Sequence, residues 1–336
     1  MKRHVAFCAG MLYLAGLGFA GVGASATTSG DSDNKAETRG GEVSTSTGWE
    51  RPKLLQQIRV YEDTVRQGEA SHAPAGSLAK VYVQLASLYA DLAMYPRAEE
   101  AIQRGVVLLR RDTGSKQGEL AAVIEDLATL HVSMGDLGKA EKEGQQALQL
   151  RLQDGDRVAI GASYRQLAAL YLRRHSFRKS VEFGERAMDS IGEVAQENAD
   201  DWVAVRFTLA KALCENGSCG RAIPLLQQGI AQAKTSYGDS SLPVGMGDFQ
   251  LGVTYWRDGQ IVDAARWLER GAALMKADLN WGHPTYINAL REYAKFLRKH
   301  GTEEAALVVE REVRQADAVV DVSRMAKMPG GVSGLR

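Results

Sequence analysis

The chain has 336 residues, with 41 Lys and Arg balanced by 41 Asp and Glu, so its formal net charge is zero. This neutrality gives no sign of the strongly basic domain that is typical of nucleic-acid binding, and we expect no nucleic-acid partner. A hydrophobic fraction of 45% is typical of a globular protein, while three Cys are too few for a disulfide scaffold and an aromatic fraction of 7% argues against an all-β chain.

The first 26 residues have the pattern of a secretory signal peptide. A short basic start precedes an uncharged, glycine-containing stretch over residues 5–24, and the small residues at 24–26 (ASA) form a signal-peptidase site. We therefore predict cleavage after Ala26 and export to the periplasm or the medium. The alternative is an uncleaved membrane anchor, because an apolar stretch of this length is able to span a bilayer.

Two further segments precede the main part of the chain. Residues 27–52 are dominated by Ser, Thr, Gly and charged residues, which predicts a disordered linker. Residues 53–78 begin with an amphipathic stretch that predicts a helix followed by a loop. The apolar face of this helix consists of Leu54, Leu55, Ile58, Tyr61 and Val65.

The remaining chain is an internal repeat. Six segments, which start at residues 85, 127, 167, 209, 251 and 293, each carry a small residue at the second position and another twelve residues later. These pairs are Ala86 and Ala98, Ala128 and Ala140, Ala168 and Ser180, Ala210 and Ala222, Gly252 and Ala264, and Ala294 and Ala306. The register indicates one structural unit repeated six times.

Each unit has the pattern of two helices joined by a turn. Apolar residues recur at helical intervals around the first small residue and again after the second. Seven residues after the first small residue, four units carry a glycine, which tolerates the left-handed backbone of a tight turn: Gly135, Gly217, Gly259 and Gly301. The small residues then lie where the paired helices approach most closely, because a large side chain would force them apart.

This pattern resembles the tetratricopeptide repeat (TPR) family, whose units carry small residues in both helices and glycine at the turn. Units of 42 residues, and the stretch from Gly282 to Ala306, resemble the longer kinesin-light-chain type. The resemblance implies an all-α, right-handed superhelical solenoid of about six helix-turn-helix units, with the helix in residues 53–78 as an N-terminal cap. It places the array at residues 79–325 and a flexible tail at 326–336, with units near 79–120, 121–160, 161–202, 203–244, 245–286 and 287–325.

Cys214 and Cys219 flank the turn of the fourth unit. In an exported protein, two cysteines across a helix–helix turn are able to form a disulfide if their Cα atoms are close enough. The alternative is two free thiols. A redox-active pair is disfavoured, because the spacing is C-x4-C rather than C-x-x-C.

No catalytic residue, cofactor or metal site is predicted. The chain has no phosphate-binding loop of the G-x-x-x-x-G-K-S/T type and no G-x-S-x-G elbow. No two of the six His have the i, i+4 spacing of a helical metal site. His131 occupies the position of a tyrosine in sister units, which predicts a packing role.

The resemblance implies that the first helix of each unit lines a concave groove that holds a peptide or helix of a partner. Residues three before, one after and four after the first small residue should face inward, and in the last unit these are Arg291, Lys295 and Arg298, with Lys299 adjacent. The other expected partner-binding residues are Phe207, Phe249, Trp256, Arg165 and Arg173. Such a groove suits a partner with an acidic or carboxylate end. The alternative is a solvated basic face on a terminal helix.

We therefore expect an exported, non-enzymatic scaffold or adaptor for a protein or peptide partner, with membrane contact only through an uncleaved signal. Two alternatives use the same solenoid. One is an enzyme subunit with its chemistry in the groove. The other is an envelope protein that binds glycan or lipid through exposed tryptophans, for which the candidates are Trp256, Trp267 and Trp281.

Overall fold

A computed structural model describes residues 47–112, 116–192, 199–279 and 283–327 of the chain. In these segments the protein has thirteen α-helices and no β-strand, which confirms the all-α class. The helices are α2 (Thr47–Ala70), α3 (Ala75–Asp91), α4 (Tyr95–Arg111), α5 (Gln117–Met134), α6 (Leu137–Asp154), α7 (Arg157–Arg173), α8 (Phe177–Ile191), α9 (Ala199–Glu215), α10 (Cys219–Tyr237), α11 (Leu242–Arg257), α12 (Ile261–Asp278), α13 (Pro284–His300) and α14 (Glu303–Lys327).

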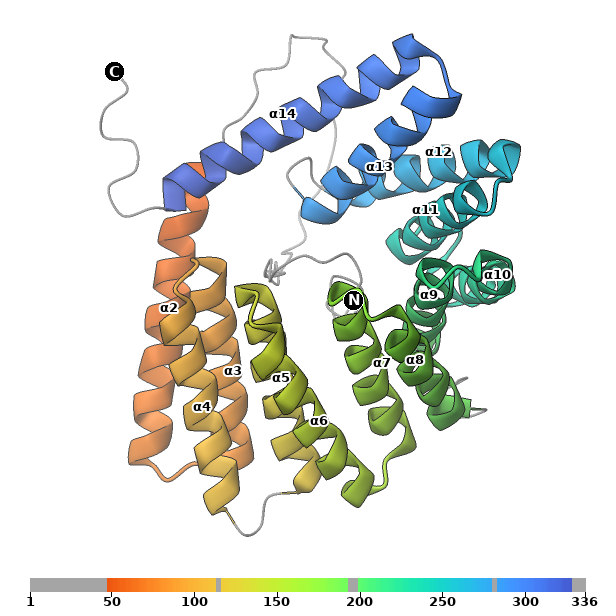
Figure 1. Cartoon of the computed structure of the whole chain (residues 1–336). Helices are drawn as coiled ribbons and strands as arrows, with labels where there is room; N and C mark the ends of the chain where they lie inside the picture. Colours follow the sequence, from red (N-terminus) through yellow and green to blue (C-terminus); the bar gives the residue numbers. More distant parts are fainter. Residues whose placement is uncertain (1–46, 113–115, 193–198, 280–282, 328–336) are drawn as a thin grey trace, which may run out of the picture.

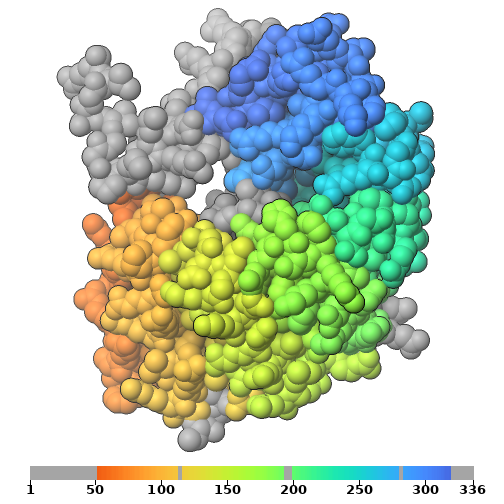
Figure 2. All heavy atoms as spheres, viewed as in Figure 1, coloured from red at the N-terminus to blue at the C-terminus, as the bar shows by residue number. Residues whose placement is uncertain are grey.

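From α3 onward, the helices form six consecutive pairs, and each pair also packs on the next. The stack curves, so that successive units follow one another around the molecule (Figures 1 and 2). Helix α2 covers the free face of α3, and the long α14 reaches back to α2, so the two ends of the array meet (Figure 1). The six-unit solenoid with an N-terminal capping helix is thereby confirmed.

The small residues of the repeat lie at the contact between paired helices. Ala98, Ser180 and Ala222 are each 0% exposed. In the third unit the two small residues touch directly, because the Ser180 hydroxyl donates a hydrogen bond to the carbonyl oxygen of Ala168 at 2.7 Å. The helix spacing at these positions therefore accommodates only a small side chain such as that of Ala or Ser.

The turn between the paired helices uses a left-handed residue in five units. Gly135, Gly217 and Gly259 each have a φ of +83°. Ala93 and His175 occupy the same position in the first and third units with φ of +58° and +55°. These two residues have a Cβ atom, so they hold the left-handed conformation under strain.

Replacing Ala93 with glycine is expected to raise the free energy of unfolding by about 0.5–1 kcal/mol. The left-handed strain that glycine removes, about 1–2 kcal/mol, exceeds the extra chain entropy that glycine loses on folding. Ala93 is exposed, so the change leaves no cavity. Urea denaturation measures the difference, with Gly259→Ala as the reverse control that should lose stability; a less stable Ala93→Gly protein would contradict the strain.

Polar side chains link neighbouring units three residues after the first small residue. The Tyr171 hydroxyl donates to Glu141 of the preceding unit at 2.6 Å. At the equivalent position the buried His131 ring lies 2.7 Å from Glu143 of its own unit and 3.2 Å from Glu99 of the preceding one. His131 therefore packs in the tyrosine position and joins two units through carboxylates.

Several boundaries differ from the predicted ones. Helix α2 begins at Thr47, so the last six residues of the expected 27–52 linker are helical, and Pro52 lies inside the helix. The array begins with α3 at Ala75 rather than at residue 79, and α14 extends to Lys327. Gly301 has a φ of −102°, so its predicted left-handed turn is wrong. Residues 1–46 and 328–336, with the expected signal peptide, lie outside the described residues.

Candidate binding groove

A groove of about 800 Å³ lies on the inner side of the last three units. Its walls come from the first helices of these units, α9, α11 and α13, and from α14 on the far side. The inner helices line it because the small residues in each pair set one face of the first helix against the second helix and leave another face toward the inside of the curve. The groove is therefore built by the repeat itself.

The structure places most of the expected inward positions of units four to six on this groove. Its lining includes Phe207, Phe249, Arg291, Lys295 and Arg298. These residues come from three successive helices, so the groove has an aromatic floor on α9 and α11 and a basic rim on α13.

The aromatic floor is rigid, because glycines of neighbouring helices fit against the ring of Phe207 and against the backbone of Phe249. Phe207 is 1% exposed, and a Cβ atom on Gly229 would lie 2.6 Å from its ring. Phe249 is 8% exposed, and a Cβ atom on Gly271 would lie 2.7 Å from its Cα atom. Little of either ring faces the groove, so both shape it more than they offer contact area.

Trp256 is not among the residues that line the groove, which corrects the prediction for this position. Its indole packs edge-on against Phe296, with ring centroids 5.5 Å apart, and against His300 at 6.2 Å. Arg257, the next residue, lines the groove instead. Burial of the large indole between units five and six is favoured over its exposure in the groove. Trp267 is also partly buried against a core cluster, and Trp281 lies outside the described residues.

The arginines of the third unit also lie away from the groove. Arg165 is 6% exposed, and its charge favours the ionised form of Asp201, although burial raises the pKa of that carboxyl overall. Arg173 is partly buried, and its charge adds to the effect of burial in lowering the pKa of Lys211. Neither of these two expected partner-binding arginines lines the groove. Packing of α7 against α9 buries Arg165, whereas Arg173 keeps part of its surface exposed.

The basic rim is paired with acidic residues of the protein itself. Arg298 forms a two-pronged ion pair with Glu310, at 2.5 and 2.7 Å, which raises the pKa of the guanidinium and lowers that of the carboxyl. Arg291 contacts Asp317 at 2.6 Å. Lys295 contacts Glu292 at 2.6 Å. Both acidic partners of the arginines belong to α14.

Lys299 does not line the groove, although it follows Arg298 directly on α13. Its side chain is exposed, and the helical twist carries it away from the rim. Lys299 was expected next to the inward-facing residues as a partner-binding candidate, and the structure places it outside the lining of the groove.

Sequence reasoning missed three charged residues at the near end of the groove. Lys211 and Glu215 of α9 line it with Arg257 of α11, and Arg257 contacts Glu215 at 2.7 Å. Burial lowers the pKa of the Lys211 amine. Lys211 follows Ala210 directly, so the rule that selects Lys295 also selects Lys211. Over the whole lining, six Lys and Arg outnumber three Glu, and the groove is net basic.

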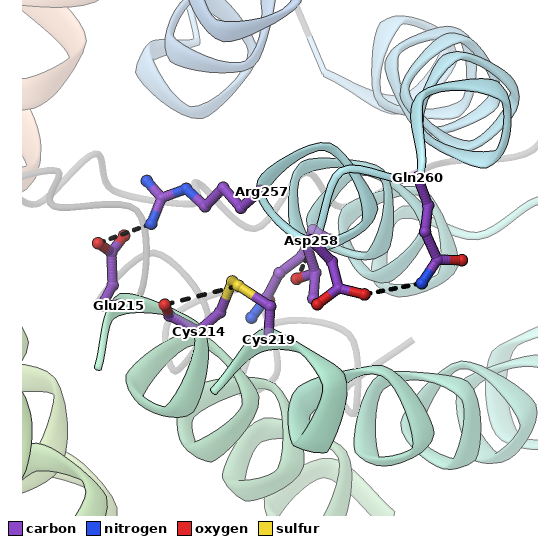
Figure 3. Close-up of a disulfide and its surroundings, with 8 residues drawn as sticks. Cys214, Glu215, Cys219, Arg257, Asp258 and Gln260 are labelled. Carbon is purple, nitrogen blue, oxygen red and sulfur yellow. Dashed lines mark hydrogen bonds and ion pairs between the residues drawn. A yellow bond between two sulfur atoms is a disulfide. The ribbon is translucent and has the colours of Figure 1, made fainter. Parts of the chain in front are cut away.

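Cys214 and Cys219 form a disulfide across the turn of the fourth unit (Figure 3). Cys214 lines the groove, with the Arg257–Glu215 ion pair beside it (Figure 3). The sixth unit has Arg298 and Glu303 at the same two positions, 3.9 Å apart. The other units have apolar pairs there, namely Ala90 and Tyr95, Val132 and Leu137, Leu172 and Phe177, and Trp256 and Ile261. The disulfide thus occupies two positions that carry an ion pair in the sixth unit and two apolar residues in the other units.

The described segments hold no cluster of three or more His, Cys, Asp or Glu side chains suited to a metal ion. Among the helices of these segments, none combines the length and the hydrophobicity needed to cross a bilayer.

The fold and the groove define a solenoid of helix pairs with a concave inner surface. Residues 119–191 match the family model described as tetratricopeptide repeat. The helix pairs on either side of the matched segment repeat the same architecture.

Solved structures with the same fold extend the comparison. Kinesin-light-chain-like TPR repeats from Podosopora anserina are 20% identical and cover 61% of this chain and 98% of their own, with a TM-score of 0.53. The apo form of RapI is 12% identical and covers 82% and 96%, with a TM-score of 0.64. A Rap conjugation gene regulator of the plasmid pLS20, in complex with the Phr* peptide, is 13% identical and covers 85% and 75%, with a TM-score of 0.60. No curated protein matches the sequence.

Proposed function

We propose that this chain is an exported, non-enzymatic TPR scaffold that binds an acidic segment of a protein partner in the groove of its last three units. The observation that carries the proposal is the groove itself, which is about 800 Å³ in volume, continuous over α9, α11 and α13 and rimmed by cations. Curved repeat arrays present such inner surfaces to extended or helical ligands.

Two proteins of the same fold support a peptide or protein as the ligand. One is the Rap conjugation gene regulator in complex with the Phr* peptide, and the other is a Rap protein complexed with Competence and Sporulation Factor. Because these proteins are only 12–13% identical to this chain, the likeness supports a shared fold, and we propose peptide binding in this groove on that basis together with its charge.

The charge of the groove favours an acidic partner. Arg291, Lys295 and Arg298 lie at intervals of four and three residues on one face of α13, which matches carboxylates presented by a helix or an extended peptide. The aromatic floor beside the basic rim favours a partner that also carries apolar side chains. An amphipathic acidic segment meets both conditions.

Arg298→Gln is expected to weaken binding of an acidic peptide about tenfold, because it removes one charge-assisted hydrogen-bond donor pair from the rim. The probe is a fluorescein-labelled, alanine-based helical peptide of about 18 residues, with Glu seven residues apart and Leu between them. Fluorescence anisotropy measures Kd for the mature protein, and a peptide with Gln in place of Glu is the ligand control.

Lys299→Gln is the matched protein control, since it removes the same charge one residue away but outside the groove. We expect its Kd to stay within about twofold of the wild type, because screening weakens charges that make no direct contact. Equal effects of Arg298→Gln and Lys299→Gln would reject the groove as the binding surface and leave only a general charge attraction.

Export is tested on protein expressed with its first 26 residues. We expect the intact mass of a chain that begins at Thr27, and no reactive thiol without reduction, since cleavage removes Cys8 and the disulfide holds the other two Cys. A mass that retains residues 1–26 would contradict cleavage and favour the membrane anchor. Capture of partners from envelope extract, with the Arg298→Gln protein in parallel, then searches for the natural ligand.

A further inference from the structure

We propose that α14 is an internal competitor for the groove. Its carboxylates form ion pairs with the same cations that pair with the partner's carboxylates when the partner binds. The inference rests on the proposed function and adds its regulation and the chemistry of the partner. Helix α14 was not expected to contribute to the groove, yet Glu310, Val313 and Arg314 line it.

The carboxylates of α14 match the cations of α13 in spacing. Arg291 and Arg298 are seven residues apart, and so are their partners Asp317 and Glu310. The lower-numbered arginine pairs with the higher-numbered acid, as two antiparallel helices require. Seven residues are two helical turns, so both pairs lie on one face of each helix. The seven-residue spacing of the α14 carboxylates is therefore the spacing that we infer for the carboxylates of a partner bound to the basic rim of α13.

The two ion pairs are open to exchange, because water reaches both of them. The Arg291–Asp317 side chains are 48% and 41% exposed, and the Arg298–Glu310 side chains are 45% and 26% exposed. Exposed ion pairs contribute only a small amount to stability, and two-pronged pairs such as Arg298–Glu310 contribute the most. A partner that brings its own carboxylates into the groove therefore replaces them at a modest cost, and this cost lowers its affinity.

The attachment of α14 also favours movement. The α13–α14 pair packs less extensively than any other pair of the array. Its connection through Gly301 lacks the left-handed turn of the other units. Buried Ala306 and Ala316 keep the helix in place when no partner is bound. The partner we infer is an acidic, amphipathic helix with carboxylates seven residues apart, whose binding loosens α14.

Neutralising the two competing carboxylates tests the proposal. We expect Glu310→Gln with Asp317→Asn to bind the acidic helical peptide described above about tenfold more tightly than wild type, since both arginines become available. The control is Glu100→Gln with Glu182→Gln, which removes two carboxylates from exposed ion pairs on α4 and α8 and should change Kd by about twofold or less. An unchanged or weaker affinity of the α14 variant would overturn the proposal.

A measurement on the wild type keeps the test valid if the double variant folds poorly. Hydrogen exchange of the α14 amides over residues 303–318 should become faster when the peptide is bound, and slower exchange would overturn the proposal. Failure of the proposed function looks different. In that case Arg298→Gln has no effect and the Gln peptide binds as well as the Glu peptide, whatever α14 does.

Discussion

Replacing Gly271 with alanine is expected to lower the free energy of unfolding by about 3 kcal/mol, a large effect for the addition of one methyl group. Gly271 lies on α12 against α11, and an ideal Cβ atom there would be 2.7 Å from the Cα atom of Phe249. Backbone atoms cannot rotate away, so the two helices must separate.

Gly220→Ala is the control, because the nearest atom to a Cβ at that position, an oxygen of Asp258, is 4.0 Å away. It should change stability by no more than about 1 kcal/mol, in the stabilising direction that helix propensity gives. Urea denaturation compares the two variants. Since Phe249 lines the groove, Gly271→Ala should also weaken binding of the acidic peptide. A Gly271→Ala protein as stable as the wild type would show that the α11–α12 contact is looser than described.

A second large effect is expected from Asp248, whose carboxylate is fully buried on α11. Arg270 of α12 approaches it to 3.2 Å, but neither carboxylate oxygen accepts a hydrogen bond of good geometry. Burial raises the pKa of Asp248 to about 6, although Arg270 and Lys234 act in the opposite direction. A carboxyl with a raised pKa in the folded state destabilises that state when it is ionised.

The sign of the pH dependence follows from this shift. Between about pH 4 and 6 the folded protein holds the Asp248 proton more tightly than the unfolded chain, so stability falls as the pH rises through this window. The loss amounts to about 3 kcal/mol above pH 6. The stability gained by Asp248→Asn should therefore be about 3 kcal/mol larger at pH 8 than at pH 4.

Denaturation with urea at both pH values measures this difference, and the cost of an unpaired buried amide cancels because it is present at both. Asp239→Asn, which removes an exposed carboxylate near the start of α11, is the control for loss of one charge. An equal gain for Asp248→Asn at pH 4 and pH 8 would show that Asp248 is not the group that titrates.

The helix pairs were predictable because their signals are local and repeated. Ala98, Ala222 and Ala264 recur at a fixed distance from their partners, and close helix packing demands such small residues. The start of α2 was missed because Pro52 and the polar composition around it indicate a boundary. The helix nevertheless continues through Pro52, although a proline inside a helix removes a backbone hydrogen bond.

The groove was predictable in part for the same reason. Positions counted from the small residue select Phe207, Phe249 and Lys295, because helical twist alone decides which side chains face inward. Trp256 and Arg165 were misplaced, because their positions depend on how closely neighbouring units pack. The ion pairs with α14 depend on the angle of that last helix, which no repeat pattern contains.

Contact between α14 and α2 has a mechanical consequence. A solenoid in which each unit touches only its neighbours is elastic, because small rotations at every interface add up along its length. Here the joined ends oppose such rotation, since a change in pitch at one interface requires an opposite change elsewhere. If tension is applied between the ends of the array, release of α14 from α2 is the first event, and elastic extension of the units follows it.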